Sequence, residues 1–448
     1  MAAGLNIAVV GAGWAGLAAA VTATQAGHTA TVFEASEALG GRARALKAVL
    51  PDGTPVLLDN GQHILIGAYA ETLRLMRSVG VTPEQVLLDL PMTLPFPDGL
   101  GIRFPNWPTP LDALGGILGA RGWSLADKWS LLRTAAAWQR QGFVCDETLS
   151  VAALCHSLTP RILAELIEPL CVSALNTPAD QASARVFLRV LRDALFGAAG
   201  GSHLLLPSTD LGSLLPQAAA HWLQQRGGQV VCKARVDSLQ RSGPQWQLMG
   251  SGLGQVAETG FDAVIWATSA SNAASALMKY GLSAPEKISR SVTAWAQTTQ
   301  ALHFEAIATI YAWSASARLT RPMLALRSST AHPAQFVFDR AALGGQSGLL
   351  AFVVSAAQGD RATLQTQVLA QAKAQLGLAL QPVLTVVEKR ATFACTPGLQ
   401  RPAQDIAPGL LACGDYVDGP YPATLEGAVR SGISAAHALD ATVQAVGS

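Results

Sequence analysis

Residues Ile7 to Glu34 read IAVVGAGWAGLAAAVTATQAGHTATVFE, and this stretch decides the fold. The apolar run at 7–10 predicts a β-strand, and the small residues that follow predict a helix. A second strand is expected over 30–33, and it ends at the acid Glu34. Strand, helix and strand in this order form a βαβ unit, so the sequence predicts an α/β fold with a parallel sheet.

Three glycines stand between the first strand and the helix, in the pattern Gly11-x-Gly13-x-x-Gly16. Gly11 permits a sharp turn, Gly13 lacks a side chain that would block a pyrophosphate, and Gly16 lets helix and strand pack closely. The helix N-terminus offers free N–H groups and a positive dipole end to the phosphates. Glu34 lies at the spacing expected for a carboxylate that accepts the ribose hydroxyls. The stretch therefore predicts dinucleotide binding.

Two other interpretations of this stretch are weaker. A glycine turn also occurs as a purely structural feature of α/β proteins, but here the turn and the acid stand together. A signal or membrane-spanning segment is disfavoured, because glycines interrupt the apolar run and no basic region precedes it.

Composition limits the class of protein. The chain has 448 residues, enough for two or three domains with an ample core. With 31 basic and 30 acidic residues, it offers no signature of a nucleic-acid partner. Charged residues make up only 14% of the chain, so we expect a large core or an apolar ligand. Six cysteines without a CxxC pair indicate reduced thiols in a cytoplasmic protein, and no metal site is expected.

The remaining pattern predicts a mixed succession of elements. A helical region is followed by strands, and a short apolar strand leads into the last helix. The expected elements are a strand-like 57–65, a helix at 69–79, short strands or irregular structure at 91–110, helices over 111–204 and 207–225, strands at 229–239 and 263–267, antiparallel strands within 295–354, a helix at 361–376, a strand at 409–413 and a closing helix at 424–439.

The C-terminal stretch 410–439 reads LLACGDYVDGPYPATLEGAVRSGISAAHAL. It resembles the closing motif of the FAD-dependent amine oxidase and phytoene desaturase superfamily. The resemblance implies that the Gly414-Asp415 turn lies beside a flavin, with the acid bonding a ribityl hydroxyl or a pyrophosphate-bound water. It also implies that the last helix directs its N-terminus at the flavin pyrimidine carbonyls. The matching residues that approach the ring are Ala423, Thr424 and Leu425.

Further matches come from other parts of the chain. Arg42, after a second glycine pair, matches a residue that neutralises phosphate or lies near the ring. Val236 matches a residue whose backbone holds the adenine, and Ala267 matches a loop over the nucleotide. Taken alone, Asp415 as a turn acid and Arg42 as a surface arginine are the less favoured alternatives. Together the matches imply FAD as cofactor, held by Gly11, Gly13, Trp14, Ala15, Gly16, Glu34, Ala35, Gly40, Gly41, Arg42, Gly61, Val236, Ala267, Gly414, Asp415, Ala423, Thr424 and Leu425.

The resemblance covers essentially the whole chain and implies its domain organisation. We expect a Rossmann-like FAD-binding domain of the glutathione-reductase type, α/β locally and part of an α+β whole. This domain is discontinuous and takes residues 1–70, 205–280 and 395–448. Residues 71–204 and 281–394 are expected to form a substrate-binding domain with helical and antiparallel β parts.

Within the superfamily, the chain is similar to the squalene-associated branch, the hydroxysqualene dehydroxylases. The likeness rests on the segments 58–80, 202–223 and 421–432. It implies reductive removal of the hydroxyl of hydroxysqualene to give squalene, a step in hopanoid or related triterpene synthesis. In that reaction the allylic alcohol leaves a delocalised cation, which takes hydride from N5 of the reduced flavin. A long isoprenoid hydrocarbon substrate suits the low charge content, because it needs an apolar tunnel.

A proton donor to the departing hydroxyl is the catalytic group to look for. His63 is the first candidate, since it follows Asp59-Asn60-Gly61 in a loop that the superfamily places near the flavin. Asp59 is either its orienting partner or a turn acid, and His63 is either catalytic or a core histidine bonded to backbone. His203 is a weaker candidate beside an apolar run.

Three other functions stay open. A carotenoid or phytoene-type desaturase would share the fold, the cofactor and an apolar pocket. An amine oxidase is disfavoured, because no lysine stands in a motif matching the flavin-facing lysine of those enzymes. A flavin- or lipid-binding protein without turnover is the third alternative. The sequence does not identify the electron donor or the oligomeric state, and no second dinucleotide motif is present.

Tryptophans and basic residues alternate in the first helical region. This composition is typical of peripheral contact with a membrane, here its inner face. It is also typical of aromatic core residues in a helical substrate domain, which is the favoured interpretation. The residues concerned are Trp107, Trp123, Trp129, Trp138, Arg121, Lys128, Arg133 and Arg140.

Overall fold

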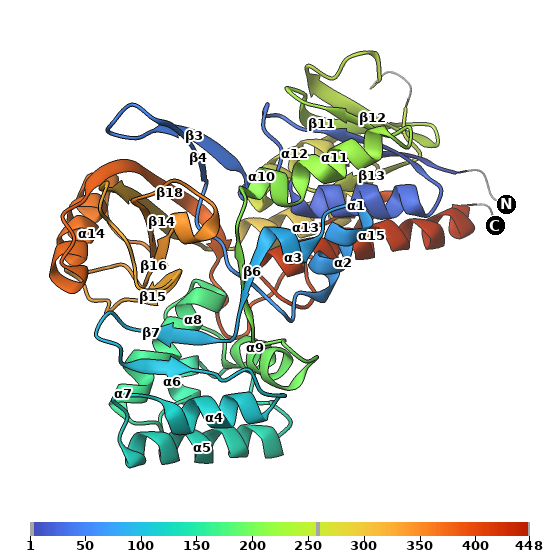
Figure 1. The fold of residues 1–448 in the computed structure, drawn as a ribbon. Helices are drawn as coiled ribbons and strands as arrows, with labels where there is room; N and C mark the ends of the chain where they lie inside the picture. The colour runs from blue at the N-terminus through green and yellow to red at the C-terminus, as the bar shows by residue number, and fades with distance from the viewer. Residues whose placement is uncertain (1–3, 257–259, 447–448) are drawn as a thin grey trace.

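A six-stranded sheet organises the computed structural model, which describes residues 4–256 and 260–446 (Figure 1). Its first five strands are parallel and the last is antiparallel, so the predicted α/β core is confirmed. The apolar strand 7–10 occupies the middle and is fully buried, which explains its unbroken hydrophobicity. In sheet order the strands are β10 (Gln229–Val231), β2 (Thr29–Phe33), β1 (Asn6–Val10), β13 (Ala263–Trp266), β20 (Leu410–Ala412) and β19 (Asp405–Ala407).

The first and last long helices, α1 (Trp14–Gln25) and α15 (Leu425–Val446), lie side by side against this sheet (Figure 1). Small residues make the close approach possible, because a Cβ on Gly432 would lie 2.1 Å from the Ala15 carbonyl oxygen. The N- and C-terminal segments therefore share one layer of the fold, as the resemblance implied.

A second sheet is antiparallel and lies apart from the first. Its strands, in order, are β15 (Met323–Ala325), β16 (Phe336–Asp339), β17 (Leu349–Val354), β14 (Phe304–Trp313) and β18 (Gln381–Phe393). Helix α14 (Arg361–Leu376) packs on one face, where Leu364 and Val368 meet Ile310 and Phe352 in a small core. The predicted antiparallel sheet is thus confirmed.

The strands of this region begin later than the sequence suggested. Residue Trp295 lies in helix α13 (Glu286–Gln300), which packs on α12 (Ala270–Ser283). The buried residues of this helix have helical spacing: besides Trp295 they are Val292, Ala296 and Thr299. The alternating pattern of the strands that follow had hidden this spacing.

The single strand predicted over 229–239 is also wrong, because the chain leaves the sheet midway. Lys233 adopts a positive φ of 57°, and its N–H donates to the Ser36 carbonyl. β10 therefore ends at Val231, and β11 (Arg235–Ser242) pairs with β12 (Gln245–Ser251) as a separate hairpin.

Residues 111–204 form the helical part, seen at the bottom of Figure 1. Helix α5 starts at a capping box in which Ser124 and Asp127 bond each other's backbone N–H groups. A π-helical segment, η1 (Leu163–Ile167), joins α7 to α8. The helices are α4 (Leu111–Gly119), α5 (Leu125–Arg140), α6 (Val151–Leu154), α7 (Pro160–Ile162), α8 (Glu168–Leu175) and α9 (Ala184–Phe196).

Short elements connect these parts. The strand-like segment 57–65 is in fact two strands separated by the loop 60–64, because β4 pairs with β3 and β5 with β9. In the described residues, no helix has both the length and the hydrophobicity needed to cross a membrane. The connecting elements are β3 (Ala45–Val49), β4 (Pro55–Asp59), β5 (Leu65–Ile66), α2 (Ala70–Ser78), α3 (Pro83–Val86), β6 (Leu87–Leu90), β7 (Thr93–Pro95), β8 (Gly101–Arg103), β9 (Leu204–Pro207), α10 (Leu211–Leu214), α11 (Pro216–Gln224) and η3 (Ala341–Leu343).

Contact between α1 and α15 gives a direct test of the core. We expect Gly432→Ala to lower the free energy of unfolding by about 1–3 kcal/mol, because the added methyl group would overlap the α1 backbone. Gly119→Ala is the control, since a Cβ there meets no atom within 4 Å. Equal denaturation midpoints for Gly432→Ala and the wild type would show that the two helices are not in close contact.

Candidate active site

The turn after β1 forms a cradle with an open helix end. Gly11 has a φ of 111°, and a Cβ on it would lie 2.8 Å from the Ala267 carbonyl oxygen. A Cβ on Gly16 would lie 2.0 Å from the Gly11 carbonyl oxygen, so this glycine serves close packing of helix and strand. A Cβ on Gly13 would meet no atom within 4 Å, and no side chain caps α1. The first-turn N–H groups of α1 are thus available to an anionic ligand.

Glu34 is fixed beside this turn at the end of β2. Its Oε2 accepts the Ala12 N–H at 2.9 Å, and its Oε1 accepts the Ser36 N–H at 2.9 Å. A carboxylate has about four lone-pair sites, so acceptor capacity remains for ribose hydroxyls after these two bonds.

Arg42 connects the N-terminal turn to the C-terminal part of the site. The Gly40 N–H donates to the Ala12 carbonyl at 2.9 Å, which holds the loop before Arg42 against the cradle. The Arg42 guanidinium forms an ion pair with Asp415 and donates to the Ala391 carbonyl. Burial disfavours its charge, but Asp415 and Glu388 outweigh burial and raise the pKa of Arg42. Arg42 therefore stays protonated in the cavity.

The corner between β20 and α15 is held in a strained conformation. The Gly414 N–H donates to Ser431 Oγ at 3.1 Å, and the Ala423 N–H donates to the Asp415 carbonyl at 3.2 Å. Ala423 has a φ of 60° and Tyr421 one of 57°, values that residues other than glycine seldom adopt. Such strain persists only where surrounding bonds determine the backbone, and it is common at ligand sites.

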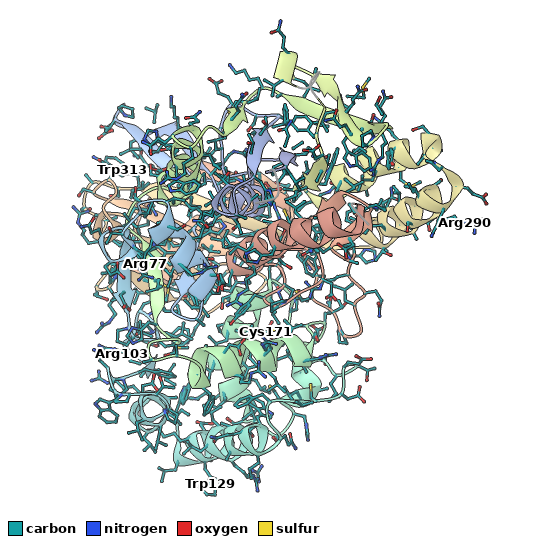
Figure 2. All side chains as sticks on the ribbon, turned by 90° about the vertical axis from the view of Figure 1, so that its right-hand side faces the viewer. Arg77, Arg103, Trp129, Cys171, Arg290 and Trp313 are labelled. Atoms are coloured by element: carbon teal, nitrogen blue, oxygen red, sulfur yellow. The ribbon has the colours of Figure 1, made fainter. Side chains whose placement is uncertain are left out.

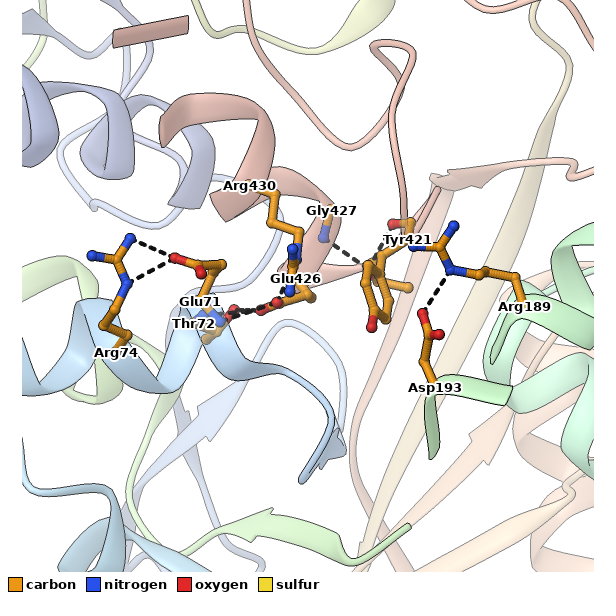
Figure 3. A network of polar contacts seen from close by, with 10 residues as sticks. Glu71, Thr72, Arg74, Arg189, Asp193, Tyr421, Glu426, Gly427 and Arg430 are labelled. Atoms are coloured by element: carbon orange, nitrogen blue, oxygen red, sulfur yellow. Dashed lines mark hydrogen bonds and ion pairs between the residues drawn. The ribbon is translucent and has the colours of Figure 1, made fainter. Parts of the chain in front are cut away.

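A buried carboxylate fixes the first turn of α15 (Figure 3). Glu426 is fully buried, and its oxygens accept the N–H groups of Glu71 and Thr72 and the Thr72 hydroxyl. Its Oε1 also accepts Arg430 Nε at 2.6 Å. Glu426 therefore supplies the N-terminal hydrogen bonds that α2 lacks from its own capping residue, Tyr69, and it ties α2 to α15.

All these segments surround one cavity of about 590 Å³. Every residue predicted to contact the cofactor lines it except Gly16, which packs against Gly11 and Ala267 instead. The glycine turn, Glu34, Arg42 and the Asp415 corner thus meet at a single space. Apolar side chains from α8 and the antiparallel sheet line another part of the wall; they are Val172, Leu175, Ile307, Phe336, Phe338 and Val353.

His63 lines this cavity, and a backbone carbonyl determines which of its ring nitrogens carries the proton. Its Nδ1 lies 2.9 Å from the Gly61 oxygen, which only accepts, so Nδ1 carries a proton. Burial and the charge of Arg42 lower the pKa of His63, although the bond to Gly61 acts in the opposite direction. At neutral pH, Nε2 therefore has a free lone pair, and His63 can donate a proton from Nε2 only after taking one up.

The structure does not bring Asp59 to His63. Asp59 is buried, and its Oδ1 accepts the Leu211 N–H at 2.8 Å while its Oδ2 lies 3.6 Å from Arg340. Burial raises the pKa of Asp59 to about 6, although Leu211 and Arg340 favour the carboxylate. Asp59 joins the loop of His63 to the antiparallel sheet, as a structural acid.

His203 lies outside the cavity. Its Nδ1 is 2.6 Å from an oxygen of Asp89, a largely exposed carboxylate. His203 thus has a hydrogen-bond partner near the surface, and it does not line the cavity in which a substrate would bind.

Several cavity residues had not been singled out from the sequence. Asn60 and Gln62 flank Gly61, so they could have been predicted from the resemblance that placed Gly61 at the cofactor. Asn60 lies 3.4 Å from Glu388 of β18, and Arg340 donates to Gln62 at 2.8 Å. Glu388 and most of the apolar wall residues belong to the antiparallel sheet, and the others to α8. No sequence motif marks them, and only the folded topology places them here.

Comparison with known proteins agrees with this geometry. Residues 14–440 match the family described as flavin containing amine oxidoreductase. The chain belongs to this family. Its members are flavin-dependent oxidoreductases, and the cofactor is FAD. The residues that line the cavity fit FAD. The N-terminus of α1 has no side-chain cap, and the space beside Gly13 is open. Glu34 stands at the end of β2, and the N-terminus of α15 lies at the far end of the cavity.

The chain is similar to two kinds of enzyme. Hydroxysqualene dehydroxylase of Rhodopseudomonas palustris is 26% identical over 96% of this chain and 97% of its own length. The 15-cis-phytoene desaturase of Synechococcus elongatus is 28% identical over 51% of this chain and 50% of its own length.

Solved structures share the fold of this flavin oxidoreductase. An oxidoreductase from Methanosarcina mazei superposes with a TM-score of 0.69 at 15% identity, covering 96% of this chain and 99% of that one. Cyclohexylamine oxidase from Brevibacterium oxydans superposes with a TM-score of 0.67 at 15% identity, covering 98% of this chain and 100% of that one.

The open space around Gly13 allows cofactor binding to be tested apart from folding. We expect Gly13→Val to weaken FAD binding by at least about tenfold, because the side chain would occupy the place of the pyrophosphate. The apoprotein should keep its melting temperature, since a Cβ there meets no protein atom. Flavin absorbance per protein and calorimetry of the apoprotein measure the two effects.

Gly119→Val is the matched control, because it adds the same side chain at an open position outside the cavity. Full FAD content in Gly13→Val would contradict the placement of the pyrophosphate at this turn.

Proposed function

We propose that this enzyme reduces an allylic isoprenoid alcohol, hydroxysqualene, to squalene. The observation that carries the proposal is the cavity itself, in which a dinucleotide cradle is continuous with an apolar wall. The end-to-end match to hydroxysqualene dehydroxylases supports it, whereas the match to the phytoene desaturase spans about half of each chain. The domain boundaries given above remain part of this proposal.

The protein's own residues have three tasks in such a reaction. Bound FAD supplies hydride chemistry at its ring. The wall formed by Phe336, Phe338 and Ile307 receives a hydrocarbon chain and excludes water, which would otherwise capture a cationic carbon. His63, in its protonated form, is the group that gives a proton to the departing hydroxyl.

A second candidate is desaturation of a carotenoid-type substrate. It is favoured by the relatives named phytoene desaturase, and the same apolar wall would serve it. Amine oxidation finds less support. Lys279 lines the cavity but belongs to α12, which packs on β11. It therefore lies toward Val236, where the adenine is expected, and not beside the flavin ring.

Product analysis distinguishes these functions. We expect the photoreduced enzyme, under anaerobic conditions, to convert hydroxysqualene to squalene with oxidation of one FAD per product. The oxidised enzyme with phytoene, and the oxidised enzyme with amines in air, are the parallel reactions. Desaturated phytoene, or peroxide formed with an amine, in the absence of squalene would contradict the proposal.

The role of His63 predicts a pH dependence. Because the pKa of His63 lies below its ordinary value of about 6.5, the donating form is scarce at neutral pH. The rate of product formation should therefore rise as pH falls towards this pKa. In His63→Gln the rate should fall by about 10²-fold or more and lose this pH dependence. His203→Ala is the control.

An unchanged pH profile in His63→Gln would remove this residue from the mechanism. FAD content must be measured in parallel, because His63 lines the cofactor cavity as well.

A further inference from the structure

Helix α4 exposes an apolar stripe at the end of the molecule remote from the parallel sheet. Leu111, Leu114 and Leu118 are all exposed, and their spacing places them on one side of the helix. The ring of Trp107, also exposed, lies across the same helix, because a Cβ on Gly115 would be 2.6 Å from it. These four large side chains form one continuous surface.

The start of helix α5 extends this surface. Leu125 and Trp129 are one turn apart and are 86% and 67% exposed. Lys128 Nζ donates to the Leu118 carbonyl at 2.7 Å, which fixes the first turn of α5 beside the end of α4. Figure 2 shows Trp129 at the lower edge of the molecule. We call this surface the α4–α5 face; its members are Trp107, Leu111, Leu114, Leu118, Leu125 and Trp129.

The tryptophans of the region thus divide into two groups. Trp123 and Trp138 are buried and belong to the core, where Trp123 donates to Glu165 at 3.0 Å. Trp107 and Trp129 face outward. The core interpretation is therefore confirmed for Trp123 and Trp138, whereas membrane contact stays a prediction for Trp107 and Trp129.

The charges around the α4–α5 face have one sign. Within 104–141 the two acids, Asp112 and Asp127, are buried; Asp112 accepts from Ser202, and Asp127 accepts from Ser124 and Thr159. The exposed charged residues of the same stretch are Arg121, Arg133 and Arg140.

Neighbouring elements reinforce this positive rim. Arg103 of β8 is close enough to Arg121 and Arg321 that their charges add to desolvation in lowering its pKa. None of these three arginines forms an ion pair within residues 4–256 and 260–446. The acids on adjoining segments, Asp98 and Glu165, instead contact Arg327.

We propose that the α4–α5 face docks on a lipid bilayer whose surface carries anionic headgroups. Its six apolar side chains would enter the boundary between headgroups and acyl chains, and the arginines of the rim would meet lipid phosphates. An apolar centre flanked by arginines that are unpaired among the described residues, with the adjoining acids Asp98 and Glu165 bound to Arg327, matches a phosphate-bearing surface. It does not match a second copy of the same face, because two such copies would bring their basic rims together. The inference concerns this surface and does not depend on the reaction in the cavity.

Flotation of the holoenzyme with vesicles tests the proposal. We expect binding to vesicles of phosphatidylglycerol mixed with phosphatidylcholine, weaker binding to phosphatidylcholine alone, and loss of binding as salt is raised. The double variant Leu125→Ser, Trp129→Ser should bind at least about tenfold less, because it removes two large apolar groups. Arg103→Gln, Arg121→Gln should lose the preference for phosphatidylglycerol.

A matched control is available at Leu282, which is 88% exposed at the end of α12, outside the α4–α5 face. Leu282→Ser should leave flotation unchanged, and all variants should keep their FAD content and melting temperature. The proposal is overturned if the wild type stays unbound with phosphatidylglycerol vesicles at low salt, or if the Leu125, Trp129 variant floats equally well. It is also overturned if that variant instead turns a dimer into a monomer on gel filtration.

Discussion

The ion pair between Arg42 and Asp415 joins residues 373 positions apart, and the site depends on this closure. Arg42 follows the loop that is hydrogen-bonded to the glycine turn, whereas Asp415 follows the strand β20. One guanidinium therefore holds the N-terminal and C-terminal walls of the cavity together. Together with the pairing of β1, β13 and β20 in one sheet, this contact fixes the separation of the two walls, so that a single long ligand can be bound by both.

Close packing of α1 and α15 provides the frame behind that contact. Gly432 lets the two helices touch, and Glu426 bonds the start of α15 to α2. Burying a carboxylate is costly unless its lone pairs are used, and here four donors surround Glu426. These bonds hold the first turn of α15 in place, and with it the strained backbone at Ala423 that faces the cavity.

Much of the cofactor half of the site follows from local sequence rules. The turn after β1 combines a strand, glycines and a helix start within a few residues, so its pattern alone predicts it. The corner at Asp415 was expected only because the C-terminal stretch resembles the closing motif of the family. The partner of Asp59 could not be predicted, because Arg340 comes from a different sheet and no spacing rule connects them. The early end of β10 depends on backbone bonds from Lys233 and Ala234 to the loop after β2, contacts that only the tertiary fold creates. Helix α13 was missed because its buried residues were read together with the strands that follow.

We propose that separated segments of the chain bind one FAD, with its ring end facing an apolar wall. A crystal structure of the protein purified with FAD measures this most directly. We predict that the pyrophosphate lies at Gly13 and the first turn of α1, and that the flavin ring lies beside Ala423, Thr424 and Leu425, with Phe336 and Phe338 across the cavity. Density for the flavin at any other place, or a pyrophosphate away from the α1 N-terminus, would contradict it.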